Sequence, residues 1–389
     1  MAGLMEKEGI DLCLLSGKEN INYFAGYDFG ELQMDDKYFN CFLVISRDAG
    51  PGPVLIVGEG NEGTASMSWL KDRRFFKYDK KQFMGAQYSS LLEEVIREKS
   101  SSKESIGLEL GPGMRPDYNI LRFVGEKFPG REVRDCSAII WKLRMVKSAA
   151  EIACLRKSCQ ITCRGYEEGF SSISQGRQEK EISAIMGAKM MEEGADCFGS
   201  GIIMFYSGKD RQTWCDGLPS QYRLRKGDLI QVDGGCSYMG YKSDLVRMAC
   251  VGDPSREQQD NFKIALEAFN ESVDAVKEGV RCSDLWMQAE KVWSRHGYDR
   301  FIKNRRADNW CTNGHGIGLD IHEPPAISLA EDRMLEEGMV ITIEAFNTHN
   351  GTWPLRDAEW WYLIENMVLV KKEGCQVLSN SMDNNLWIA

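Results

Sequence analysis

Two of the four histidines in this 389-residue chain lie seven positions apart in the stretch NGHGIGLDIHEPP, residues 313–325. His315 stands between two glycines, and His322 comes shortly before two prolines. An imidazole can bind a divalent metal ion, and it can also exchange a proton near neutral pH. Short motifs also match by chance. This stretch alone therefore leaves two interpretations open: a structural turn or a reactive site.

Four acidic residues interrupt apolar runs elsewhere in the sequence, and the pattern predicts that all four lie within strands. A buried carboxylate is costly unless it is paired or bound to a cation. Four of them together with His315 favour a site for two divalent ions, whose charge four carboxylates would balance. Two ions about 3.5–4 Å apart can supply a nucleophile at neutral pH. The four residues are Asp233 in QVDGG, Asp244 in YKSDLVR, Glu344 in VITIEAF and Glu365 in YLIENMVLV.

Composition excludes several classes of protein. A hydrophobic share of 43% is typical of a folded protein, and 389 residues favour two domains. The net charge of −10 argues against nucleic-acid binding. No apolar run reaches the about 20 residues that a membrane helix needs, and the first 30 residues do not resemble a signal peptide. Thirteen cysteines without a CxxC pair favour a reducing cytoplasm.

Periodicity divides the chain near residue 145. Before it, short apolar runs such as DLCLLSG and CFLVIS alternate with a helical pattern at 88–99, which predicts a smaller α/β domain. After it, the pattern of two helices followed by strands occurs twice, which indicates internal pseudo-symmetry. The second repeat begins with a capping box at Ser255–Gln258 and ends with MVITIEAF and WYLIENMVLV as the last two strands. Residues 198–224 are expected to form a loop beside a site.

The segments VDGGCSYMGYKSDLVR, GHGIGLDIHEPP, ITIEAF and LIENMVLV resemble, in order and spacing, the pita-bread metalloenzyme family of creatinase, prolidase, aminopeptidase P and methionine aminopeptidase. NINYFAGY, residues 20–27, resembles the N-terminal domain of the creatinase and prolidase branch. The resemblance implies an α+β fold: a pita-bread catalytic domain with pseudo-twofold symmetry at 146–389, after a creatinase/prolidase-type α/β domain at 1–145. It also implies a homodimer.

The same resemblance implies a role for each candidate residue. The protein would bind two divalent ions (Mn, Fe, Co or Zn). Glu344 would also assist proton transfer, and His322 would contact the substrate or move a proton. The implied metal ligands are Asp233, Asp244, His315, Glu344 and Glu365.

Two positions depart from the pattern of the family members that cleave Xaa-Pro bonds. These usually carry one histidine four residues before the ligand histidine, where this chain has Cys311, and another in the loop that here reads TWCDG. The metal centre is therefore expected to be intact and the substrate pocket altered. The candidate substrate-binding residues are Trp214, Asp216, Cys311 and His322.

Aromatic residues near the ligands have two interpretations: ordinary core packing, or a box that holds a methylated onium group by cation–π contact. They are Trp214, Trp310, Trp353, Trp360, Trp361 and Tyr362.

Three functions follow from these patterns. The leading one is a two-metal hydrolase that cleaves an amide or peptide-like C–N bond in a small molecule or dipeptide. The alternative is a lyase that converts a small onium zwitterion such as dimethylsulfoniopropionate into dimethyl sulfide and acrylate, although Gly235 stands where that lyase family has an extra aspartate. The third is a metal-free binding protein, against which the complete ligand set argues.

Overall fold

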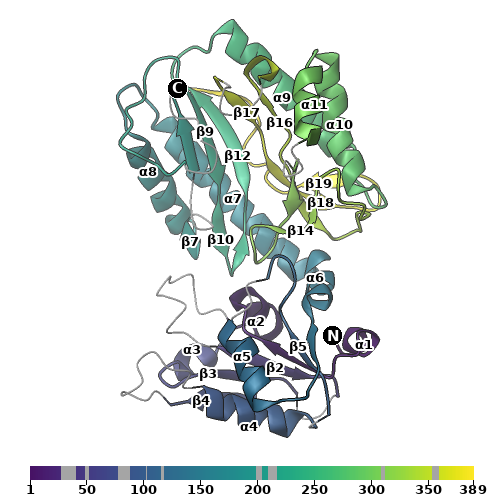
Figure 1. The fold of residues 1–389 in the computed structure, drawn as a ribbon. Coiled ribbons are helices and arrows are strands. Elements are labelled where there is room, and N and C mark those ends of the chain that lie inside the picture. Colours follow the sequence, from purple (N-terminus) through teal and green to yellow (C-terminus); the bar gives the residue numbers. More distant parts are fainter. Residues whose placement is uncertain are drawn as a thin grey trace. The chain divides into compact units, whose positions relative to one another are not determined.

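The computed structural model describes residues 1–27, 41–48, 52–77, 88–101, 103–114, 118–198, 204–208, 217–307, 312–352 and 359–389. The chain divides into two compact units, Met1–Arg144 and Met145–Ala389 (Figure 1). Among the described residues, no helix is both long and apolar enough to cross a membrane.

The first unit is built on a mixed sheet with the strand order β4-β3-β2-β1-β5-β6. The predicted strands DLCLLSG and CFLVIS form β1 and β2, which pair antiparallel, and the predicted helix at 88–99 forms α4. The strands are β1 (Leu12–Leu15), β2 (Phe42–Ser46), β3 (Val54–Gly58), β4 (Arg73–Phe76), β5 (Ile106–Leu108) and β6 (Val133–Asp135). The helices are α1 (Ala2–Lys7), α2 (Lys18–Ala25), α3 (Glu62–Ala65), α4 (Ser89–Lys99), α5 (Tyr118–Lys127) and α6 (Ser137–Met145).

Both faces of this sheet are covered, which explains why β1 is apolar at every position. Successive strand residues point to opposite faces. Leu12 and Leu14 pack into the core that contains side chains of α4 and α5, whereas Cys13 and Leu15 pack into the core that contains side chains of α2 and α6.

The described residues of the second unit form four small sheets and two pairs of long helices. Its helices are α7 (Ala149–Ser171), α8 (Glu179–Glu192), α9 (Arg256–Asp274), α10 (Cys282–Arg295), α11 (Asp299–Ala307) and the 3-10 turn His349–Gly351. Strands of its first half are β7 (Cys197–Phe198), β8 (Met204–Ser207), β9 (Leu229–Gly234), β10 (Cys236–Tyr238), β11 (Tyr241–Lys242) and β12 (Leu245–Cys250). Strands of its second half are β13 (His315–Gly316), β14 (Glu323–Ala326), β15 (Val340–Ile343), β16 (Phe346–Thr348), β17 (Trp361–Leu363), β18 (Asn366–Val370), β19 (Cys375–Val377) and β20 (Trp387–Ile388).

The two halves of this unit repeat one plan, as the sequence predicts. In the first half, α7 packs on α8 and contacts β10, β11 and β12; in the second, α9 packs on α10 and contacts β15, β16 and β17 (Figure 1). A capping box starts the leading helix of each half, at Ser148 with Glu151 for α7 and at Ser255 with Gln258 for α9. In each half, one antiparallel strand pair contains or adjoins two of the predicted carboxylates: β9 with β12, and β15 with β18.

The halves are joined where Val246 of β12 forms an antiparallel bridge with Glu365. The guanidinium of the buried Arg247 stabilises this junction. Its Nη1 donates to the carbonyl oxygens of Val246 (2.9 Å) and Glu365 (2.8 Å). Its Nη2 donates to Asn366 Oδ1 at 2.7 Å, and its Nε donates to the Asp383 carbonyl at 2.9 Å. One buried side chain therefore ties β12 and the segment around Glu365 to the C-terminal segment.

Two expectations about this unit are wrong in detail. Within 198–224, which the sequence predicts as a loop, residues Met204–Ser207 form β8 and pair with β9. Beyond the predicted last strand, β19 pairs with β18 and β20 pairs parallel with β12. Both β19 and β20 are very short, and a strand of two or three residues carries almost no periodic signal.

Candidate metal centre

The four predicted carboxylates come from equivalent places in the two halves. Asp233 lies in β9, and Asp244 comes immediately before β12. Glu344 comes immediately after β15, and Glu365 immediately before β18. The prediction that all four lie within strands is therefore correct only for Asp233. The other three residues lie just outside a strand. Their side chains therefore do not have to follow the alternation by which successive strand residues point to opposite faces.

All five predicted ligand residues and His322 converge on one place in the second unit. His315 Nε2 lies 3.7 Å from Asp244 Oδ2 and 3.8 Å from Glu365 Oε1. Two ligand atoms that each lie about 2.1 Å from one ion stand roughly 3–4 Å apart, which these separations match. Three overlapping groups of ligand atoms lie within 4.8 Å of one another: Asp233, Asp244 and Glu365; His315, Glu344 and Glu365; and Asp244, His315 and His322.

Two carboxylate oxygens in this cluster are buried without a hydrogen bond from any described residue. They are Asp244 Oδ1 and Glu365 Oε1, on side chains that are almost fully buried. A buried acceptor without a partner is costly, and folded proteins rarely leave one. A cation held between the carboxylates would satisfy both oxygens. The donor set therefore fits divalent metal ions.

The electrostatics of the cluster point the same way. Burial raises the pKa of Asp233 to about 7 and that of Glu344 to about 8. Burial also raises the pKa of Asp244 and of Glu365 well above the usual range, and neighbouring carboxylates add to the shift. Four buried groups of like charge cannot all ionise together unless a positive charge lies among them.

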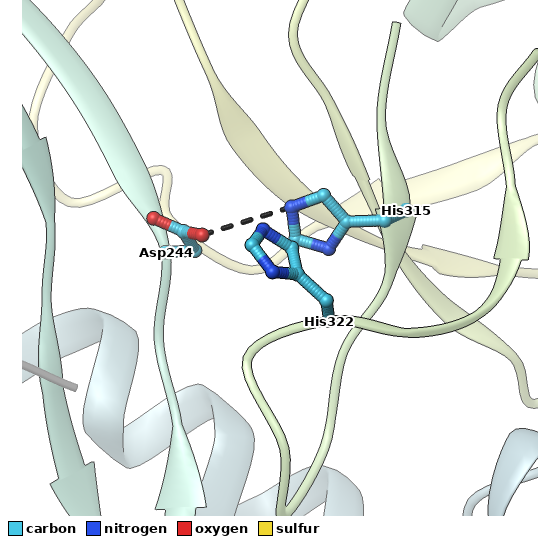
Figure 2. A group of neighbouring side chains, drawn as sticks. All are labelled: Asp244, His315 and His322. Atoms are coloured by element: carbon cyan, nitrogen blue, oxygen red, sulfur yellow. Dashed lines mark ion pairs between the residues drawn. The ribbon is translucent and has the colours of Figure 1, made fainter. Parts of the chain in front are cut away.

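His315 is arranged to present one nitrogen lone pair. Burial lowers its pKa to about 3, with a further contribution from His322, so the imidazole is neutral. Its Nδ1 lies 3.0 Å from the Gly316 carbonyl oxygen, which can only accept. The proton therefore belongs on Nδ1, and Nε2 faces Asp244 with its lone pair (Figure 2).

His322 stands beside His315 on the turn between β13 and β14 (Figure 2). The two rings meet edge to face, with centroids 4.3 Å apart and an interplanar angle of 81°. The side chain of His322 remains exposed, and partial burial lowers its pKa. It lies next to the cluster and open to a substrate, in contrast to the buried His315.

The candidate substrate-pocket residues Trp214, Asp216 and Cys311 lie outside the described residues, as do Cys215, Trp310 and Trp353.

The three other aromatic residues belong to the core. Trp360 and Tyr362 pack in the apolar cluster around Phe262 and Ile341, and the Trp361 ring stacks on Phe346. Their burial bears out core packing, so the onium-box interpretation is wrong for these three.

Two threonines that the sequence did not point to form hydrogen bonds with the predicted ligands. Thr312 Oγ1 donates to Glu344 Oε1 at 3.4 Å, and Thr342 Oγ1 accepts from the backbone N–H of His315 at 3.2 Å. Thr342 precedes Glu344 by two positions, so the alternation of a strand could have placed both on one face. Thr312 carries no such signal.

Comparison with known proteins agrees with this geometry. The model of metallopeptidase family M24 matches residues 153–372, and that of the creatinase/prolidase N-terminal domain matches residues 2–146. The chain is 27% identical to the Xaa-Pro dipeptidase of Pyrococcus horikoshii over 379 residues, which cover 97% of this chain and 95% of the relative.

Solved structures of similar proteins have the same fold. The prolidase from Pyrococcus furiosus superposes with a TM-score of 0.79 at 26% identity, covering 98% of this chain and all of that one. The Xaa-Pro dipeptidase from Bacillus anthracis superposes with a TM-score of 0.81 at 25% identity, covering all of this chain and 97% of that one.

The family and the α+β pita-bread fold that the sequence predicts are therefore confirmed. Membership implies a metallopeptidase-type hydrolase that uses divalent metal ions. The chain belongs to metallopeptidase family M24, in the creatinase and prolidase branch.

Proposed function

We propose that this protein is a two-metal hydrolase that cleaves the peptide-like C–N bond of a dipeptide-sized substrate. The observation that carries the proposal is a neutral histidine and four carboxylates around one point, with two buried carboxylate oxygens that have no partner among the described residues. The proposed metal ligands are Asp233, Asp244, His315, Glu344 and Glu365. Bound divalent ions would supply Lewis acidity toward a carbonyl oxygen and make water a nucleophile at neutral pH.

The protein's own groups then have separate tasks. Thr312 Oγ1 donates a hydrogen bond to Glu344 Oε1, and this bond orients the carboxylate. We assign to Glu344 the uptake of a proton from water and its delivery to the departing amine. His322 is exposed beside His315, where a ring N–H can donate to the oxygen on which charge develops.

Xaa-Pro dipeptides are the first substrates to test, because relatives named Xaa-Pro dipeptidases match nearly the whole chain. A second candidate class is a compact substrate, such as a small zwitterion. It is favoured by Cys311 and by the TWCDG loop, since both replace histidines beside the bond that those relatives cleave. Each missing donor would cost about 3–4 kcal/mol of oxyanion stabilisation.

The lyase alternative receives no support from the geometry. A Cβ atom added at Gly235 would lie 2.3 Å from the carbonyl oxygen and 2.5 Å from the Oγ of Ser243. An aspartate at position 235 would therefore force the backbone of two neighbouring segments apart. The extra carboxylate of that lyase family has no room here.

One panel of assays decides between the two substrate classes. The protein is loaded with Mn²⁺ and tested against Ala-Pro, Gly-Pro, Ala-Ala and a set of small zwitterions, with a chelated sample as control. Efficient hydrolysis of Ala-Pro alone would establish the plain dipeptidase. Activity confined to a compact zwitterion would establish the altered pocket, and Trp214→Ala should then raise KM more than it lowers kcat. Activity that survives complete removal of metal would overturn the metallohydrolase.

We also expect a homodimer in the cytoplasm, as the family resemblance implies. Light scattering of the purified protein measures the first, and cell fractionation the second. A monomer of 44.1 kDa in solution would refute the dimer.

A further inference from the structure

Lys147 and Glu323 form an ion pair inside the second unit that is almost completely removed from water. Lys147 Nζ lies 3.2 Å from Glu323 Oε2, and each side chain is only 1% exposed. Charged groups are rarely buried to this extent unless they are paired, because each loses its hydration. The pair lies outside the set of predicted metal ligands.

The carboxylate of Glu323 also lies within the turn that carries His322. Its Oε1 accepts from the backbone N–H of Asp320 at 3.2 Å. A Cβ atom added at Gly318 would lie 2.6 Å from the same oxygen, so the glycine is what leaves space for the carboxylate. One carboxylate thus closes the turn with one oxygen and binds Lys147 with the other.

Lys147 is itself fixed at both the backbone and the side chain. Its N–H donates to the Gly338 carbonyl at 2.9 Å, and the next residue, Ser148, caps α7. The lysine therefore connects the turn to the start of the longest helix described in this unit. His322 directly precedes Glu323, and its ring lies against that of His315 (Figure 2).

We propose that Lys147, acting through Glu323, is a positioning residue that holds the His322 ring beside the metal cluster. The inference rests on the proposed role of His322. The turn that carries the exposed His322 ring sets its distance from His315. Without the buried cation, the carboxylate would turn away from its place and the turn that it closes would relax. A misplacement of about 1 Å in such a group can cost roughly 100-fold in rate.

Three variants test the pair. Lys147→Met removes the charge, Glu323→Gln keeps the size and the acceptor for Asp320 but breaks the ion pair, and Lys147→Arg restores a cation. Lys99→Met is the matched control, because Lys99 is 3% exposed and its Nζ lies 3.5 Å from Asp72 Oδ2 in the other unit. Circular dichroism and metal content are measured for each variant.

The first readout is the position of the ring, and it needs no substrate. The chain has only four histidines, so selective ¹³C labelling gives four ring signals, and the signal lost in His322→Ala is that of His322. In the Zn²⁺-loaded protein, Lys147→Met and Glu323→Gln should shift or broaden this signal. Lys147→Arg should restore it in part, and Lys99→Met should leave it unchanged.

The second readout is kinetic, on whichever substrate the panel identifies. Both single variants should lower kcat by roughly 10- to 100-fold and change KM by less than about threefold, with metal content unchanged. The double variant Lys147→Met/Glu323→Gln should be no worse than the poorer single variant, since the two residues act together.

Folded Lys147→Met and Glu323→Gln proteins with an unchanged His322 signal would overturn the inference, even if the protein proves to have no hydrolase activity. If Lys147→Met or Glu323→Gln does not fold, the double variant Lys147→Met/Glu323→Gln decides, because it leaves neither an ammonium nor a carboxylate charge buried. A shifted signal with unchanged kcat would support the positioning of the ring but overturn the catalytic role of His322.

Discussion

Removing the divalent ions should make the stability of the second unit fall as pH rises through neutrality. A carboxyl whose pKa is higher in the folded state keeps its proton there, while the unfolded chain has already released it. Unfolding is then favoured by rising pH. This applies to Asp233, with a pKa of about 7, and to Glu344, with a pKa of about 8.

The size of the effect follows from these values. Between pH 6.5 and 7.5 the two folded-state carboxyls hold one to two protons that the unfolded chain lacks, which corresponds to about 2 kcal/mol over that pH unit. His315 and His322, whose pKa is lowered by burial, act in the opposite sense and together subtract less than about 1 kcal/mol. Asp244 and Glu365 act in the same sense as Asp233 and Glu344, because burial raises their pKa as well.

The net loss is therefore at least about 1 kcal/mol over this interval, or a fall in Tm of at least about 2–4 °C for a unit of this size. Thermal unfolding is followed by tryptophan fluorescence, since eight of the ten tryptophans lie in the second unit. The chelated protein is compared with the Mn²⁺-loaded protein at both pH values. The double variant Asp233→Asn/Glu344→Gln should remove much of the slope in the chelated sample, and Asp332→Asn, an exposed carboxylate, should not.

Identical pH dependence in chelated and loaded protein would refute the reasoning, because ligation should keep the carboxylates ionised at both pH values. An unfolding temperature that chelation does not change at either pH would do the same.

Three further predictions concern single residues. Asp244→Asn should abolish activity and lower metal content as measured by elemental analysis, and a variant with full metal content and full activity would contradict its assignment as a ligand. His322→Ala should lower kcat by roughly 10²–10⁴-fold with metal retained; loss of metal would mean that the roles of His315 and His322 are exchanged. Arg247→Met should lower the free energy of unfolding, measured by urea titration, by at least about 3 kcal/mol, because several buried carbonyl oxygens would lose their donor. A loss below about 1 kcal/mol would show that Arg247 does not hold the junction.

Most of the site could be predicted from the sequence because its residues carry local signals. Each carboxylate interrupts an apolar run, and each run forms a strand or a strand end that leads to the same point. The breaks beside Asp244, Glu344 and Glu365 could not be predicted, since a strand and a strand with an interruption have the same apolar pattern. The structure also supplies Thr342, which alternation could have placed beside Glu344.

The buried pair of Lys147 and Glu323 lies beyond this kind of reasoning. The two residues are 176 positions apart, and each looks like an ordinary surface charge in its own segment. No periodicity relates them, and only the tertiary structure brings Lys147, just before α7, next to Glu323 at the start of β14. The parallel pairing of β20 with β12 was missed because β20 has only two residues and therefore almost no periodic signal.

The bridge between Val246 and Glu365 has a consequence for the order in which the site is assembled. The strand pair of each half brings only two of the four carboxylates, and His315 belongs to the second half alone. A complete ligand set exists only after the halves have docked, and docking brings like charges together. Metal uptake and docking are consequently one thermodynamic event: a chain divided in the 251–255 loop would yield two fragments whose affinity for each other is set by the concentration of the ion.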